Sequence, residues 1–231
     1  MGGQIYLMNA DGSNTQQLTA ESQGAVIPSW FPDGRHLLYV VERSATFKAI
    51  DIETRQPVLL AELHQEVAKP QLSPDGKEIA FASITNGAYD LWIMEVNTKR
   101  LRQLTFDNAT GFPVWSPDGK LLAAQRGQGS DTHVIVVNPL NGAVQDLLAD
   151  HAQNWVNAWS PDGGRIYYAK LETNGVWNIW AISRSTGVQT KLTHYTALDS
   201  FVRYPVVSPR GDRLVYEYSA STGNIWILEF R

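Results

Sequence analysis

The segment Pro113-Val-Trp-Ser-Pro-Asp-Gly119 decides the fold of this chain, because closely similar segments recur along it at a nearly constant spacing. The other copies end at Gly34, Gly76, Gly163 and Gly211, so that successive glycines are 42, 43, 44 and 48 residues apart. Self-similarity at a period of this size is the signature of a repeat architecture, in which each repeat is one supersecondary unit. The repeat period is therefore a stronger guide to the fold than the secondary-structure propensity of any single segment.

The Ser-Pro-Asp-Gly end of the segment suits a tight turn between two antiparallel strands. Proline presets φ for the second position of a type I turn, aspartate suits the third, and glycine supplies the positive φ that closes a hairpin. The last copy departs from this pattern, with Arg210 in place of the aspartate. Alternating apolar runs follow the turns, at residues 36–41, 78–82, 121–125, 165–169 and 213–218. Alternation of this kind predicts strands and not helices.

A second pair of strand-like runs completes each period. The first run resembles Asp90-Leu-Trp-Ile-Met-Glu95 and occupies residues 4–9, 47–52, 90–95, 133–138, 178–183 and 224–229. The second run occupies residues 15–19, 100–105, 144–148 and 189–193. Each period thus predicts four antiparallel strands, which we name A to D in chain order, with the Pro-Asp-Gly turn between A and B. This unit is typical of a β-propeller blade, in which each sheet packs its face on the next.

The composition narrows the possible functions. The chain has 231 residues with 19 basic and 23 acidic side chains, and its net charge of -4 provides no basic surplus for a phosphate backbone. We therefore expect no nucleic-acid partner. Without cysteine there can be no disulfide or thiolate metal site, and without a long apolar run we expect no membrane insertion. Residues 1–14 lack the features of a secretory leader, so the chain itself encodes no export signal.

The repeat resembles the WD40-like repeat (PD40) of the TolB-like β-propeller family. The similarity rests on the Pro-x-Trp-Ser-Pro-Asp-Gly-Lys pattern of residues 113–120, the Asp-Leu-Trp-Ile-Met run of residues 90–94 and the closing Gln-Leu-Thr of residues 103–105, and it covers essentially the whole chain. The resemblance implies an all-β fold and favours a periplasmic or other extracytoplasmic location. It does not settle the activity, because the same blades also accompany peptidases, and a fold does not by itself imply a function.

The strand count raises the question of how a ring would close. The pattern predicts two strands at the N-terminus, four complete repeats and three final strands, all within one domain over residues 1–231. We favour five blades, with residues 14–19 serving as strand D of the last blade. A six-bladed ring with one incomplete blade is the alternative. A closed ring should be monomeric, whereas an open ring should self-associate, because its exposed blade faces would be costly in water.

Candidate binding residues lie where functional variation is expected in this architecture. The Pro-Asp-Gly turns occupy one face of the blades, so the D-to-A and B-to-C connections share the other face. The ends of the D-to-A connections should ring the mouth of a central channel, at Ile27, Lys69, Phe112, Val156 and Tyr204. We expect ligand or partner binding at Glu66, Lys69, Phe112, Trp155, Arg203 and Tyr204. The alternative is that these residues form only channel packing with a solvated rim.

Other constellations are better explained by structure than by chemistry. His64, Asp107 and His151 recur at one place in the period, but they follow the outermost strand, where blades diverge, so we expect no metal site. The segment Gly127-Gln-Gly-Ser-Asp131 differs from the Gly-x-Ser-x-Gly pattern of hydrolases and predicts a turn. The recurring tryptophans should pack between blades; these are Trp30, Trp92, Trp115, Trp159, Trp180 and Trp226. We therefore expect neither a catalytic residue nor a cofactor.

Three functions follow from these observations, and the first is favoured. It is a non-enzymatic scaffold that holds a protein or peptide on the face of the D-to-A and B-to-C connections. The second is a propeller-type lyase or glycan-processing enzyme, for which the available groups are Glu66, Lys69, Arg203 and Tyr204. The third is a structural or engineered repeat fragment whose only activity is assembly.

Overall fold

The computed structural model describes residues 2–42, 44–63, 65–85, 87–220 and 224–229, with side chains up to residue 220 except that of residue 85. Within these residues all regular structure is β, and no helix is present that could cross a membrane. Contacts divide the chain into two units, Met1–Asn108 and Ala109–Arg231, and we describe each by itself. The prediction of one domain over residues 1–231 stays a prediction.

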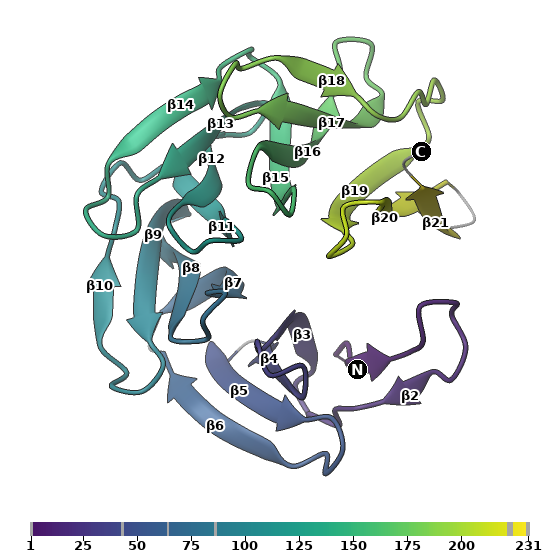
Figure 1. Ribbon diagram of the computed structural model, residues 1–231. Coiled ribbons are helices and arrows are strands. Elements are labelled where there is room, and N and C mark those ends of the chain that lie inside the picture. The colour runs from purple at the N-terminus through teal and green to yellow at the C-terminus, as the bar shows by residue number, and fades with distance from the viewer. Residues whose placement is uncertain (1, 43, 64, 86, 221–223, 230–231) are drawn as a thin grey trace. The chain divides into compact units, whose positions relative to one another are not determined.

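The first unit contains the two-stranded sheet of β1 and β2 and two four-stranded sheets (Figure 1). The strands are β1 (Tyr6–Leu7), β2 (Gln16–Gln17), β3 (Ala25–Trp30), β4 (His36–Val41), β5 (Thr46–Asp51), β6 (Pro57–Glu62), β7 (Glu66–Leu72), β8 (Glu78–Thr85), β9 (Ala88–Glu95) and β10 (Leu101–Gln103). Strands β3 to β6 and strands β7 to β10 each follow one another in chain order across their sheet. Both sheets therefore have the predicted A-to-D order.

The second unit contains two further four-stranded sheets and one three-stranded sheet. The strands are β11 (Thr110–Trp115), β12 (Leu122–Gln128), β13 (Asp131–Val137), β14 (Val144–Leu148), β15 (Gln153–Trp159), β16 (Arg165–Leu171), β17 (Trp177–Ser183), β18 (Gln189–Lys191), β19 (Phe201–Val207), β20 (Arg213–Ser219) and β21 (Asn224–Glu229). Neighbouring strands pair antiparallel throughout, as in the register Leu122↔Val137 of β12 and β13. The predicted four-stranded antiparallel sheets are confirmed, while the blade number and the mode of ring closure stay predictions.

The Ser-Pro-Asp-Gly turns close by a recurring set of hydrogen bonds. In the turn before β12, the Ser116 hydroxyl donates to Asp118 at 2.7 Å and accepts the Leu121 N–H at 2.9 Å, while Gly119 has a φ of 69°. In the last turn, where Arg210 replaces the aspartate, the Ser208 hydroxyl donates at 2.7 Å to Asp212 instead. The departure from the pattern is thus compensated two residues further along the chain.

The innermost strands share a β-bulge at the residue before the proline. Ile27, Lys69, Phe112 and Tyr204 all have a φ between 46° and 58°, a left-handed conformation that non-glycine residues seldom adopt. In β3 the pairing passes from Val26↔Val40 to Ser29↔Leu38, so that two residues oppose one. The bulge interrupts the ladder within strand A, and pairing resumes beyond it, as at Ser29↔Leu38 and Gln71↔Ala80.

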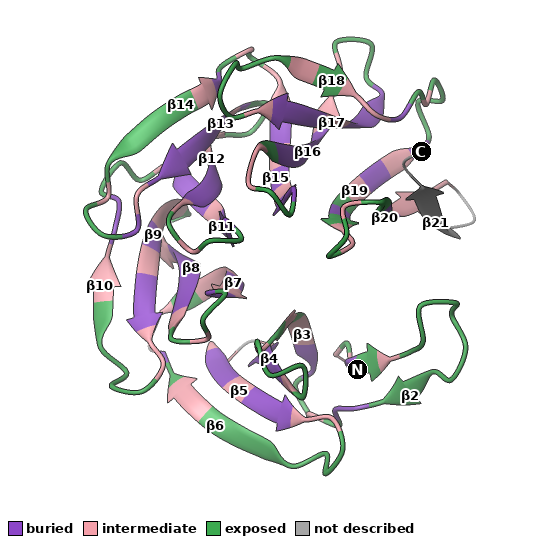
Figure 2. Cartoon of the chain, in the orientation of Figure 1, coloured by how far each residue is buried: buried purple, intermediate pink, exposed green. Residues whose placement is uncertain are grey.

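Apolar side chains pack between successive sheets within each unit. Phe47 of β5 meets Phe81 of β8 edge to face, with ring centroids 5.6 Å apart, and both rings are fully buried. The side chain of Trp159 is buried in the second unit, and its indole N–H donates to the Val114 carbonyl at 2.9 Å. Figure 2 shows the contrast with the outer strands β6 and β14, which are largely exposed. Each sheet therefore buries its faces and leaves strand D at the surface.

The tryptophan prediction is right at most positions and wrong at one. Trp115 and Trp159 are buried, and Trp92 and Trp180 are partly buried against the core clusters. Trp226 lies outside the residues whose side chains the structure describes. Trp30, however, is 48% exposed. The sheet before β3 in this unit has only the two strands β1 and β2, so it lacks the inner strand that Trp159 contacts at the corresponding place.

Candidate functional site

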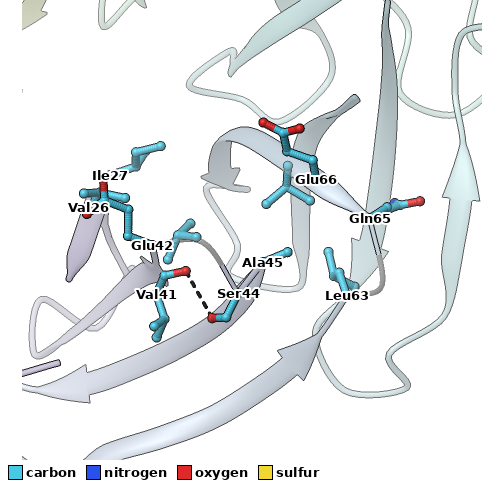
Figure 3. A pocket seen from close by; sticks show the side chains of 11 residues that line it. Val26, Ile27, Val41, Glu42, Ser44, Ala45, Leu63, Gln65 and Glu66 are labelled. Carbon is cyan, nitrogen blue, oxygen red and sulfur yellow. Dashed lines mark hydrogen bonds between the residues drawn. The ribbon is translucent and has the colours of Figure 1, made fainter. Parts of the chain in front are cut away.

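A cavity of about 620 Å³ lies in the first unit between β3, β4 and β7. Its lining includes the B-to-C connection at Glu42, Ser44 and Ala45 and the D-to-A connection at Leu63 and Gln65. Figure 3 shows Ile27 and Glu42 on one side of this space and Glu66 on the other. The B-to-C and D-to-A connections thus both line one cavity. Glu66 is the predicted binding residue that lines it.

The cavity combines apolar walls with few polar groups. Valines and isoleucine form much of the lining, and the Ser44 hydroxyl is within hydrogen-bond distance of the Val41 carbonyl, at 3.3 Å, and of the Thr46 hydroxyl, at 2.9 Å. The Gln65 amide nitrogen is buried without a hydrogen-bond partner. The structure gives neither Glu42 nor Glu66 an ion pair within the described part of the chain. Glu42 and Glu66 are therefore the ionisable side chains among the described residues of the lining.

Lys69 is half-buried three residues beyond Glu66, in the bulge of β7. Removal of its ammonium group from water lowers the pKa of Lys69 to about 7. It is not one of the residues that line the cavity. The structure therefore places Glu66 and Lys69 on one strand but in different surroundings.

A cluster of aromatic rings forms in the second unit at three strands. Trp155 of β15 lies 4.4 Å from Trp177 of β17, and both contact Phe201 of β19, at centroid distances of 5.4 and 5.1 Å. We call Trp155, Trp177, Phe201, Arg203 and Tyr204 the aromatic cluster. Sequence reasoning identified Trp155, Arg203 and Tyr204 of this group but missed Trp177 and Phe201, since neither recurs at the repeat period.

Arg203 joins the aromatic cluster through its guanidinium group. Two of its nitrogens donate to the Glu217 carboxylate, at 2.8 and 2.7 Å, which fixes the planar group in one orientation. The guanidinium carbon lies 5.3 Å from the Phe201 ring centre and 5.0 Å from that of Tyr204. Tyr204 is 51% exposed. Three of the predicted binding residues, Trp155, Arg203 and Tyr204, are thus near one another, while Phe112 lies at the corresponding bulge of β11.

The D-to-A connection beside this cluster is held by a buried polar network. The Asn178 side-chain oxygen accepts from the Thr193 hydroxyl at 2.9 Å and from the Tyr195 N–H at 2.8 Å. The Thr193 hydroxyl accepts the Ile179 N–H at 2.8 Å. Tyr195 in turn stacks on Tyr218 at a centroid distance of 4.8 Å. A signal for this network was present in the sequence, because the same threonine recurs as Thr19 and Thr105.

The remaining sequence candidates are the His and Asp residues that follow the outermost strands and the segment of residues 127–131. Within the described ranges, no three His, Asp or Glu side chains converge as metal ligands. His151 is exposed, with its Nδ1 atom 3.2 Å from an Asp131 carboxylate oxygen, and His64 lies outside the described residues. Gln128 pairs with Asp131 across the hairpin, so residues 127–131 form the predicted turn.

Comparison with known proteins shows similarity to TolB proteins, in a family model and in curated relatives. A family model described as the TolB beta propeller domain matches residues 46–230. The Tol-Pal system protein TolB of Francisella tularensis subsp. tularensis (strain WY96-3418) is 27% identical over 223 residues, which are 92% of this chain and 50% of the relative. The chain spans about half the length of these curated relatives.

Solved structures agree on the fold. The crystal structure of TolB from Acinetobacter baumannii superposes with a TM-score of 0.84 at 22% identity, covering 98% of this chain and 57% of that one. An oligogalacturonate lyase in complex with manganese superposes with a TM-score of 0.71 at 15% identity, covering 97% and 70%. Identities this low show a common fold alone. The predicted propeller class is confirmed.

Proposed function

Since this chain belongs to the TolB beta-propeller family, we propose that it is a non-enzymatic scaffold that binds a protein segment. The observation that carries the proposal is the aromatic cluster of strands β15, β17 and β19. Tryptophan, tyrosine and arginine are the side chains that most often dominate binding energy at protein interfaces. The cluster presents all three, with Tyr204 half exposed and Arg203 held by Glu217.

The partner we propose is a component of the Tol-Pal system, acting in the periplasm. Support comes from the names of curated relatives in Francisella tularensis and Anaeromyxobacter dehalogenans, which are Tol-Pal system proteins. The pairing of Arg203 with Glu217 favours binding over catalysis, because it commits the cluster's charged group to a structural contact. The likeness to an oligogalacturonate lyase, at 15% identity, concerns the fold alone.

The test measures binding of purified Pal protein by isothermal titration calorimetry. Trp155→Ala and Tyr204→Ala should each weaken binding about 30-fold, which corresponds to a hot-spot loss of about 2 kcal/mol. Tyr6→Ala is the matched control, because Tyr6 is also an exposed tyrosine, at 56%, but lies in the first unit. Unchanged affinity in both cluster variants would rule out this surface, and an absence of Pal binding by the unmodified chain would rule out this partner.

The non-enzymatic part of the proposal has its own assay. Incubation of the chain with oligogalacturonate, with and without added Mn²⁺, should produce no unsaturated product absorbing in the ultraviolet. Product formation that depends on Arg203 would replace the scaffold with the lyase alternative.

A further inference from the structure

We infer that strand β6 (Pro57–Glu62) is a contact surface at which two copies of this chain pair antiparallel, about a two-fold axis at Leu59. β6 is the outer strand of a complete four-stranded sheet, which has the order β3-β4-β5-β6. This surface belongs to the first unit alone, so it is separate from the aromatic cluster and from the question of how a ring would close. Three features of β6 point to the pairing, namely its length, its exposed side chains and the charges at its two ends.

β6 is the longest and least charged of the described outer strands. It has six residues, whereas β10 and β18 have three each and β14 has five. Each of those three strands also carries a charged residue; these are Arg102, Asp146 and Lys191. In β6 the one charged residue is Glu62, at the end of the strand. Proteins protect sheet edges from pairing by short strands and by charged side chains, and β6 has neither along most of its length. Its protection is Pro57, which removes one N–H at the start of the strand.

The edge of β6 exposes apolar side chains. Val58 is 59% exposed and Leu59 is 54% exposed, while Leu60 and Ala61 beside them pack against a core cluster of the unit. Among the described strands β6 has a neighbour on one side, β5, in the register Lys48↔Leu59. Its second row of backbone N–H and C=O groups therefore faces away from the sheet, as a template for another strand. Such a strand would also cover the two exposed apolar side chains.

The charges at the two ends of β6 indicate that the added strand is a second copy of β6. Glu62 ends the strand, and Arg55 lies two residues before its start, with both side chains exposed. In an antiparallel pair about a two-fold axis at Leu59, Glu62 of each copy lies opposite Gln56 of the other copy and next to its Arg55. Opposite charges across paired strands are stabilising, and like charges are destabilising. The antiparallel pair is therefore complementary in charge, whereas an in-register parallel pair would place Glu62 beside Glu62.

The position of Arg55 suits this contact. It lies in the turn between β5 and β6, with a φ of 57°. Its Nη2 atom donates to the side-chain oxygen of Gln16 at 2.7 Å, and a guanidinium group carries further N–H donors for a carboxylate. A two-fold pair uses the same edge of both copies and closes on itself. We therefore expect a dimer and not a fibre.

Sedimentation equilibrium of the purified chain, from micromolar to near-millimolar concentration, should show a reversible monomer–dimer equilibrium. Leu59→Lys should weaken dimerisation about tenfold or more, because the two lysines would face each other across the axis. Leu140→Lys is the matched control, since Leu140 is 87% exposed but lies in the turn between β13 and β14 of the second unit. A chain that stays monomeric throughout, even if an extended peptide binds to it, would overturn the inference. Equal dimerisation of the two lysine variants would do the same.

Two charge reversals, Arg55→Glu and Glu62→Arg, test the self-complementarity directly. Either variant alone brings like charges together at both ends of the paired strands and should dimerise several-fold more weakly than the parent. An equimolar mixture of the two should recover dimerisation, because each end of the mixed pair again joins opposite charges, and native mass spectrometry identifies the heterodimer by its mass. Urea unfolding of each variant checks that the fold is intact. A mixture no more dimeric than its components would contradict the pairing. Tyr204→Ala should dimerise like the parent, which separates this result from the test of the proposed function.

Discussion

Replacement of Thr193 by valine is the most direct test of how the fold positions its D-to-A connections. Thr193 is 6% exposed and Asn178 is fully buried, so water cannot take over the hydrogen bonds that the hydroxyl makes. The hydroxyl accepts the Ile179 N–H at 2.8 Å and donates to the Asn178 side-chain oxygen at 2.9 Å. Valine has nearly the same shape as threonine, so the substitution removes these two bonds with little change in volume.

The expected loss follows from which groups are left without partners. The Asn178 oxygen still accepts the Tyr195 N–H at 2.8 Å, so it stays satisfied. The Ile179 N–H has no substitute acceptor, and a buried N–H in this state costs about 1–3 kcal/mol. We therefore expect Thr193→Val to lower the free energy of unfolding by about 2 kcal/mol. Thr193→Ser keeps the oxygen and loses one methyl group, which should cost about 0.8 kcal/mol.

Two measurements check this prediction. Urea unfolding gives the free energies, with an unchanged slope showing that the variants expose the same surface. Hydrogen exchange followed by NMR reports on the Ile179 N–H itself, whose protection should fall in Thr193→Val and persist in Thr193→Ser. Thr105→Val should behave in the same way in the first unit, where Thr105 accepts the Leu91 N–H at 2.9 Å. A serine variant less stable than the valine variant, or full protection of Ile179 in the valine variant, would refute the reasoning.

Two further predictions concern stability. The first compares Trp159 with Trp30, which occupy the same place in the repeat, and the second concerns the buried ammonium group of Lys69. Trp159→Ala should lower the free energy of unfolding by about 3–5 kcal/mol, because Trp159 is only 6% exposed. Trp30→Ala should lower it by less than about 1 kcal/mol, because Trp30 is 48% exposed. Equal losses of the two variants in urea unfolding would contradict this prediction. Burial lowers the pKa of Lys69 to about 7 from an ordinary value of 10.5, so between these values the unfolded chain holds more protons and stability should rise with pH. The contribution from Lys69 is at most about 1.4 kcal/mol per pH unit, and Lys69→Met should remove it between pH 7 and 9; identical slopes for variant and parent would show that Lys69 does not titrate there.

Much of the fold could be predicted because its signals are local. The Pro117-Asp118-Gly119 turn depends on the φ preferences of adjacent residues, and strand alternation depends on neighbours two positions apart. Both are present in a window of a few residues, and their recurrence identified the four-stranded unit. Even the departure at Arg210 was visible, although its compensation by Asp212 needed the actual hydrogen bond.

The candidate site was predicted only in part. The sequence put Trp155, Arg203 and Tyr204 at the ends of the D-to-A segments, and the structure places them within the innermost strands β15 and β19. Trp177 and Phe201 were missed, since they are 24 residues apart in the chain and meet only when two sheets pack. The exposure of Trp30 was missed for a related reason, because it depends on which strands the preceding sheet contains.

By itself, the sequence determined the repeat, the strand order within each sheet and the family, since these follow from backbone preferences and spacing along the chain. The tertiary structure decided which side chains share one environment. It brought Glu42 and Glu66 to one cavity, left the Gln65 amide unpaired and buried Lys69 enough to lower its pKa. Desolvation and charge compensation depend on distances between segments far apart in the chain, and no local pattern of residues encodes those distances.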